Sequence, residues 1–141
     1  MIVINRMVAD RSESDVQIKL MAERRLFLKR RWRATAEDGT EFGFDLDSRL
    51  NNGAVILQTE VADYVIWQEP EIVHEIPFES AGQSALIGWK IGNLHLPVQV
   101  LAASILVQQD LAVTQLCERE GWLATEVRVV FNPLRVTAHA S

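Results

Sequence analysis

The chain has 141 residues, 48% of them hydrophobic, with a net charge of −5 and an isoelectric point of about 5.2. This acidic balance does not favour nucleic acid as a partner. No apolar run approaches the ~20 residues that cross a bilayer, and residues 1–10 lack the pattern of a secretory signal, so we expect a cytoplasmic protein with no membrane partner. The single cysteine excludes an internal disulfide.

The first half reads as short strands separated by turns. Val16, Ile18 and Leu20 alternate with polar residues, as in a half-buried strand. Asp38-Gly39 is a strong hairpin signal, because glycine tolerates a positive φ, and alternating residues flank it on both sides. Asn51-Asn52-Gly53 predicts a second turn. We therefore expect an all-β first half, with strands near residues 16–20, 32–36, 40–44, 54–57, 64–67 and 72–76.

Six cations are concentrated between Arg24 and Arg33, with apolar side chains between them. Phe27 and Trp32 superficially resemble a stacking platform for nucleic acid. Against that, the whole chain is acidic and Trp32 alternates toward the predicted core. A solvated or partner-facing strand is the alternative that this pattern favours.

The pattern changes at Pro77. Ile87 and Ile91 are spaced as on one face of a helix, which we place between Ser80 and Ile91, with Gly92-Asn93 ending it in a left-handed conformation. We expect an edge strand at 96–100, a buried strand at 105–107, a helix at 110–120 ended by Gly121, and a strand at 123–131.

From residue 72 this order is strand, helix, strand, strand, helix, strand, as in a split βαβ, ferredoxin-like fold. The predicted fold class is α+β: a small all-β domain over residues 1–76, followed by a ferredoxin-like βαββαβ domain over residues 77–141 that ends in a short flexible tail.

Three histidines are present, and His95 has the most specific setting. It follows Gly92-Asn93 at a helix-to-strand corner, where one ring nitrogen can stay accessible to Ni²⁺, Cu²⁺ or Zn²⁺. A histidine hydrogen-bonded to the neighbouring turn is the alternative. One imidazole holds such ions weakly, but two copies across a two-fold axis would make a shared site.

The other candidate ligands have simpler interpretations. His74 shares a predicted strand face with Ile72 and Ile76 and is expected to be a half-buried structural histidine. His139 lies in the tail and is a further candidate ligand. Cys117 lies on the apolar stripe of its helix, so we expect an inert buried thiol. The carboxylates are scattered, and no catalytic signature is present, so an enzyme is not expected.

The segment from Gly92 to Gln99 resembles the Gly-Asn-x-His-x-Pro-x-Gln signature of UreE-type urease accessory proteins. The similarity extends in order and spacing from about Arg24 to Leu134. It includes Asp38-Gly39-Thr40-Glu41-Phe42-Gly43 and the closing Phe131-Asn132-Pro133.

This resemblance implies a homodimeric nickel metallochaperone that delivers Ni²⁺ to the urease apoprotein together with a GTPase and other accessory proteins. His95 would hold the metal at the dimer interface, and Zn²⁺ and Cu²⁺ are further candidate ions for this site. The resemblance also implies a first domain of a partner- or peptide-binding type.

The chain departs from the family pattern in three places. Leu94 stands where an arginine is usual, Gln108-Gln109 replaces a region that often carries a histidine, and His139 alone represents the histidine-rich tail of some members. Ni²⁺ usually takes more ligands than two imidazoles supply, so tail residues, water or the partner must provide the others. A urease-assembly scaffold or protein-binding module with weakened metal binding is therefore the alternative function.

Overall fold

The computed structural model describes residues 1–135. The described chain divides into two compact units, Met1–Glu69 and the residues from Pro70 onward. The predicted boundary after residue 76 is wrong. Strand β7 (Glu71–Pro77) pairs along its length with two strands of the second unit, so its backbone hydrogen bonds assign it there. The predicted α+β fold class is confirmed, with an all-β unit first.

The first unit contains two three-stranded sheets, in the orders β1-β4-β3 and β2-β6-β5. In each sheet the first strand of the order runs parallel to the central one, whereas the other neighbour is antiparallel. A short 3₁₀ helix, η1 (Arg24–Leu28), occupies the first part of the basic stretch, so the prediction of a strand is wrong for these residues. The strands are β1 (Ile2–Ile4), β2 (Gln17–Ala22), β3 (Arg31–Thr35), β4 (Glu41–Asp45), β5 (Val55–Gln58) and β6 (Asp63–Gln68).

Aromatic side chains from both sheets meet in the core of the first unit. Trp32 stacks on Phe44 with ring centroids 4.0 Å apart, and Phe42 meets Tyr64 edge-on at 5.4 Å. These contacts confirm the prediction that Trp32 packs toward the core. The hairpin predicted at Asp38-Gly39 joins β3 to β4, and Gly39 has a φ of 89°.

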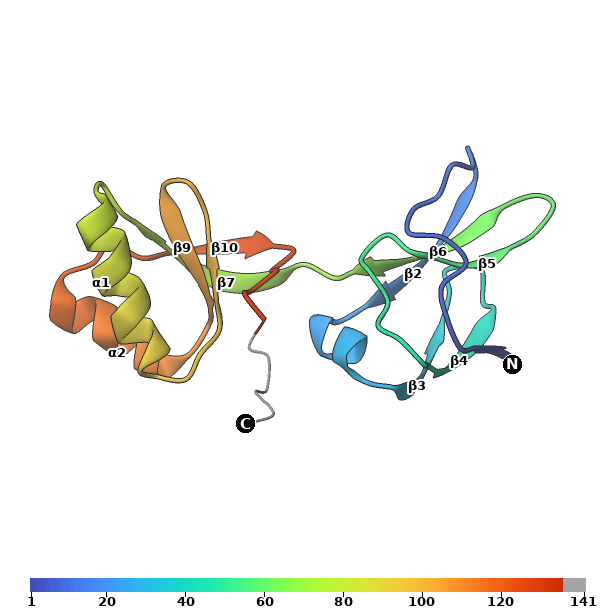
Figure 1. Cartoon of the computed structure of the whole chain (residues 1–141), viewed down its shortest axis with the longest axis horizontal. Coiled ribbons are helices and arrows are strands. Elements are labelled where there is room, and N and C mark those ends of the chain that lie inside the picture. The colour runs from blue at the N-terminus through green and yellow to red at the C-terminus, as the bar shows by residue number, and fades with distance from the viewer. Residues whose placement is uncertain (136–141) are drawn as a thin grey trace. The chain divides into compact units, whose positions relative to one another are not determined.

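The second unit is a four-stranded antiparallel sheet in the order β10-β7-β9-β8, with α1 and α2 on the same side of it (Figure 1). This is the order expected for a ferredoxin-like domain. Its further elements are α1 (Ala81–Gly92), β8 (Val98–Val100), β9 (Ser104–Gln108), α2 (Leu111–Glu120) and β10 (Thr125–Val129). No helix in the described part of the chain is long and apolar enough to cross a membrane.

Local signals set the ends of both helices. The Ser80 hydroxyl accepts a hydrogen bond from the Gln83 N–H, and the Asp110 carboxylate accepts one from Ala112, so each is an N-cap. Gly121 ends α2 with a φ of 73°, as predicted. The buried Ile87 and Ile91 fix which face of α1 meets the sheet.

The other face of this sheet is covered by the chain that follows β10. Val73 and Leu106 point to this face, and the fully buried Phe131 packs against them. The segment then reaches the opposite edge, where the Leu134 N–H donates to the carbonyl of Val98 at 2.7 Å. The segment 130–134 therefore crosses the sheet from β10 to β8, and the described chain ends beside β8.

Candidate metal centre

The turn that carries His95 continues directly from the last residues of α1. Asn93 donates its backbone N–H to Trp89, Leu94 to Ile91, and His95 to Gly92, at 3.1, 2.9 and 3.0 Å. Three successive hydrogen bonds hold the backbone in a tight coil up to the histidine. The chain then leaves this coil toward β8.

The left-handed residue of this turn is His95 itself, with a φ of 60°. The prediction that Gly92-Asn93 would adopt this conformation is wrong, because Asn93 is right-handed, with a φ of −67°. A left-handed conformation costs a non-glycine residue roughly 1–2 kcal/mol. Leu94 and Leu96 pack against the core on either side and hold the histidine in place. The strained backbone position thus coincides with the candidate ligand, a coincidence typical of functional sites.

The His95 side chain is exposed. Among the described residues, its ring has no hydrogen-bond partner, so the turn does not occupy the imidazole. Within the same part of the chain, no group of three or more His, Cys, Asp or Glu side chains is placed to hold a metal ion. One copy of the chain therefore offers a single accessible imidazole at this corner, and further ligands must come from elsewhere.

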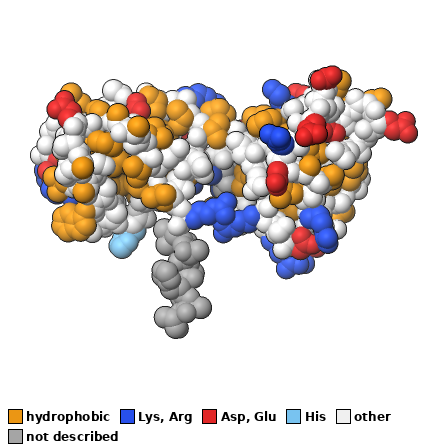
Figure 2. Space-filling view, turned by 45° about the horizontal axis from the view of Figure 1, so that its top comes forward, with side chains coloured by type: hydrophobic (Ala, Val, Ile, Leu, Met, Phe, Trp, Pro, Cys, Tyr) orange, Lys and Arg blue, Asp and Glu red, His pale blue; other side chains and the backbone are white. Residues whose placement is uncertain are grey.

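Apolar side chains on the outer face of α1 lie close to His95 in the sequence. Trp89 is 65% exposed and Leu86 is 45% exposed, and the two are three residues apart, on one face of the helix. Figure 2 shows hydrophobic side chains, in orange, at several places on the surface of this unit. An exposed apolar face beside a candidate ligand is what a self-complementary interface requires.

Gln99 has a structural role that sequence reasoning missed. Its Oε1 accepts the backbone N–H of Asn132 at 2.9 Å, and so ties the segment 130–134 to β8. Gln99 belongs to the Gly92–Gln99 motif and Asn132 to the Phe131-Asn132-Pro133 motif. Nothing in the sequence indicated that these two residues are in contact.

The remaining candidates behave as predicted where the structure describes them. His74 is buried between two strands, and its Nε2 lies 3.4 Å from the Thr114 hydroxyl, so it is a structural histidine. Cys117 is buried in the core of the second unit, and burial raises the pKa of its thiol, which keeps it protonated and unreactive. His139 lies outside the described residues.

Residues 71–141 match the family model for the C-terminal domain of the UreE urease accessory protein. Similar proteins named urease accessory protein UreE come from several bacteria. The Bacillus cereus protein is 31% identical over 124 residues, which cover 86% of this chain and 82% of that protein. The Chelativorans protein is 27% identical over 107 residues, which cover 74% of this chain and 68% of that protein. The Ruegeria protein is 29% identical over 109 residues, which cover 76% of this chain and 60% of that protein.

Proposed function

The chain belongs to the UreE family of urease accessory proteins, and from that premise we propose that it carries Ni²⁺ for delivery to the urease apoprotein. The observation that carries the proposal is the exposed, left-handed His95, whose ring makes no hydrogen bond to any other described residue. Delivery of a metal ion needs ligand exchange rather than catalysis. A site with few protein ligands leaves coordination positions open, and through these the ion passes to its acceptor.

The metal would lie between two copies of the chain. A single imidazole per chain cannot hold Ni²⁺ tightly, whereas a two-fold axis near His95 places two imidazoles on one ion. Trp89 and Leu86 support this location, since a dimer formed around His95 would bury their exposed apolar surface. Zn²⁺ and Cu²⁺ also favour imidazole nitrogen, so both ions should compete for the same site.

His139 is proposed as an additional ligand on grounds of chain length alone. Leu134 is hydrogen-bonded to Val98, only three residues from His95 in the sequence. The five residues from Leu134 to His139 span up to ~17 Å when extended, enough to bring a tail histidine back to the corner.

Isothermal titration calorimetry with Ni²⁺ tests the site. The wild type should bind about one ion per two chains, and His95→Ala should abolish this binding. His139→Ala should weaken the affinity without changing the stoichiometry. His74→Gln is the matched control, because it removes a histidine that the fold has buried, and it should bind like the wild type. Undiminished binding by His95→Ala would defeat the proposal.

Sedimentation of the same proteins tests the dimer. Trp89→Glu places a charge on the outer face of α1 without touching the core, so it should shift the wild-type dimer to monomer and remove Ni²⁺ binding with it. Leu123→Glu is the control, since Leu123 is 80% exposed and belongs to the loop between α2 and β10. A Trp89→Glu protein that remains dimeric would place the interface elsewhere.

A further inference from the structure

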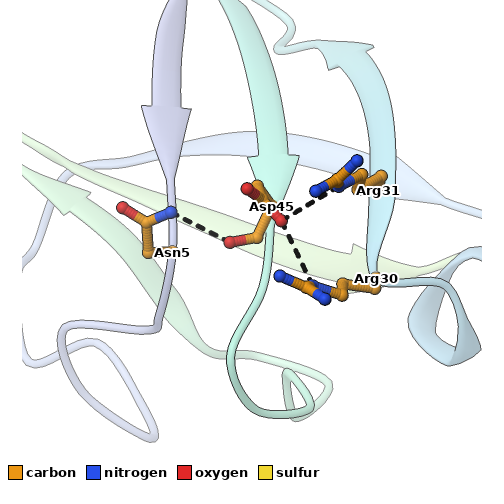
Figure 3. A network of polar contacts seen from close by, with 4 residues as sticks. All are labelled: Asn5, Arg30, Arg31 and Asp45. Carbon is orange, nitrogen blue, oxygen red and sulfur yellow. Dashed lines mark hydrogen bonds and ion pairs between the residues drawn. The ribbon is translucent and has the colours of Figure 1, made fainter.

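Two neighbouring arginines of the first unit share one carboxylate oxygen. Arg30 Nε lies 3.2 Å and Arg31 Nε 3.3 Å from Oδ1 of Asp45 (Figure 3). Asp45 ends β4 directly opposite Arg31 on β3, and the Asn5 side chain donates to its backbone carbonyl at 2.9 Å. The sheet therefore fixes the backbone of Asp45, and its carboxylate contacts both guanidinium groups.

The Nη groups of Arg30 and Arg31 remain available to bind a further anion. Each guanidinium contacts Asp45 through Nε, and neither has another hydrogen bond or ion pair with a described residue. Their side chains are 69% and 73% exposed. The two Nη groups of a guanidinium form a planar fork that matches a carboxylate or phosphate. One negative charge shared by two cations also leaves the cluster positive.

The surroundings of the pair determine which anion fits. Lys29 and Arg33 are exposed next to the pair in the sequence, and Leu28 is 62% exposed. Acidic residues limit this basic surface, since Asp47 is paired with Arg6 and Glu41 is exposed on β4. A long phosphate backbone would meet these carboxylates and the net charge of −5, whereas a short acidic peptide would not extend beyond the cations.

We propose that the surface formed by Lys29, Arg30, Arg31 and Arg33 docks a short acidic segment of a partner protein. Carboxylates of that segment occupy the free Nη edges of Arg30 and Arg31, while exposed Leu28 offers an apolar contact beside them. Arginine clusters recognise acidic motifs in this way, and the interaction weakens with salt because the groups are exposed. The inference concerns the first unit and does not depend on metal binding by the second.

Fluorescence anisotropy with a labelled, short poly-glutamate peptide tests the proposal on the full chain. The wild type should bind, and the double variant Arg30→Gln/Arg31→Gln should bind about tenfold more weakly, the combined effect of losing two solvent-exposed charge-assisted pairs. Arg6→Gln is the matched control, since it removes an exposed arginine paired with one aspartate of the same unit. It should bind like the wild type. Equal binding by the double variant, or no binding by the wild type, would overturn the proposal.

Two further experiments are needed. One distinguishes recognition by the planar guanidinium groups from attraction by positive charge alone, and the other distinguishes a peptide ligand from a nucleic acid. Arg30→Lys/Arg31→Lys keeps the charge but loses the forks, so its affinity should fall toward that of the glutamine variant; wild-type affinity would refute recognition by the forks. A single-stranded oligonucleotide should bind more weakly than the peptide at the same salt, and tighter binding would contradict the assigned class of partner. Circular dichroism spectra identify any variant that fails to fold.

Discussion

The side chain of Gln99 holds the backbone of Asn132 across the sheet of the second unit, through a 2.9 Å hydrogen bond from the Asn132 N–H. Gln99 lies on β8, at the sheet edge farthest from β10, to which Asn132 is close in sequence. Together with the bond from Leu134 to Val98, this contact brings the end of the described chain to the strand that follows His95.

Replacing Gln99 by methionine should loosen that segment. The variant keeps the length of the side chain but loses the acceptor, so we expect a loss of about 1 kcal/mol in the free energy of unfolding. The amides of Asn132 and Leu134 should exchange faster with deuterium. Gln99→Glu retains an acceptor oxygen and should restore protection. As a control, Gln109→Met removes an exposed glutamine bonded to Glu126 and should leave these amides unchanged. Protected amides in Gln99→Met would refute the role of this bond.

The left-handed backbone at His95 predicts that function and stability oppose each other there. His95→Gly and His95→Ala both remove the imidazole, but only glycine adopts a φ of 60° without steric cost. The glycine variant should therefore be more stable than the alanine variant by about 1 kcal/mol. Urea denaturation measures the difference. Equal stabilities would mean that the turn relaxes when the histidine is removed.

Tyr64 should control the titration of Asp38 in the hairpin between β3 and β4. The Tyr64 hydroxyl donates to Asp38 at 2.6 Å and the Thr40 N–H donates at 3.0 Å, and these bonds lower the pKa of Asp38 below its ordinary value of 3.8. The resulting stabilisation is present above the ordinary pKa and is lost as the pH falls through the lower, folded-state pKa.

Tyr64→Phe should therefore raise the pKa of Asp38 and move acid unfolding to higher pH. Thr40→Val is the graded control, because it keeps the stronger bond from Tyr64 and the backbone N–H, so its effect should be smaller. An NMR titration of the Asp38 carboxyl carbon gives both values. Coincident curves for wild type and Tyr64→Phe would exclude the tyrosine as the main cause.

Alanine substitutions at Gly53 and Gly39 should differ in their cost to stability. Both strain a backbone with a positive φ, but only the one at Gly53 also creates a close contact. Both glycines have a positive φ, 86° and 89°, but a Cβ at Gly53 would lie 3.2 Å from the Trp67 ring, whereas at Gly39 it would meet nothing within 4 Å. Gly53→Ala should therefore cost about 1 kcal/mol or more beyond Gly39→Ala. Thermal unfolding of the two variants tests this. Similar losses in both variants would show that the indole moves aside freely.

Short-range signals accounted for most of the elements. The alternation on either side of Asp38-Gly39 predicted a hairpin, and the stripe of Ile87 and Ile91 predicted a helix, because each depends on residues that are neighbours along the chain. The candidate metal site could be predicted only as a sequence motif, without its surroundings. His95 could be selected from the sequence, whereas the exposure of its ring and the nearby apolar face of Trp89 and Leu86 depend on how α1 packs on the sheet.

The apolar patterning of the sequence determined the α+β order of the elements. Hydrogen bonds within a few residues decide the helix caps at Ser80 and Asp110 and the turn at Gly121. Only the tertiary structure decided that β7 belongs to the second unit, that β1 runs parallel to β4, and that Gln99 holds Asn132. The left-handed residue of the turn is also His95, and not Gly92 or Asn93 as the sequence had predicted. Leu94 and Leu96, on either side of His95, pack on the core of the second unit and hold that strained conformation, which local preference alone would have given to glycine or asparagine.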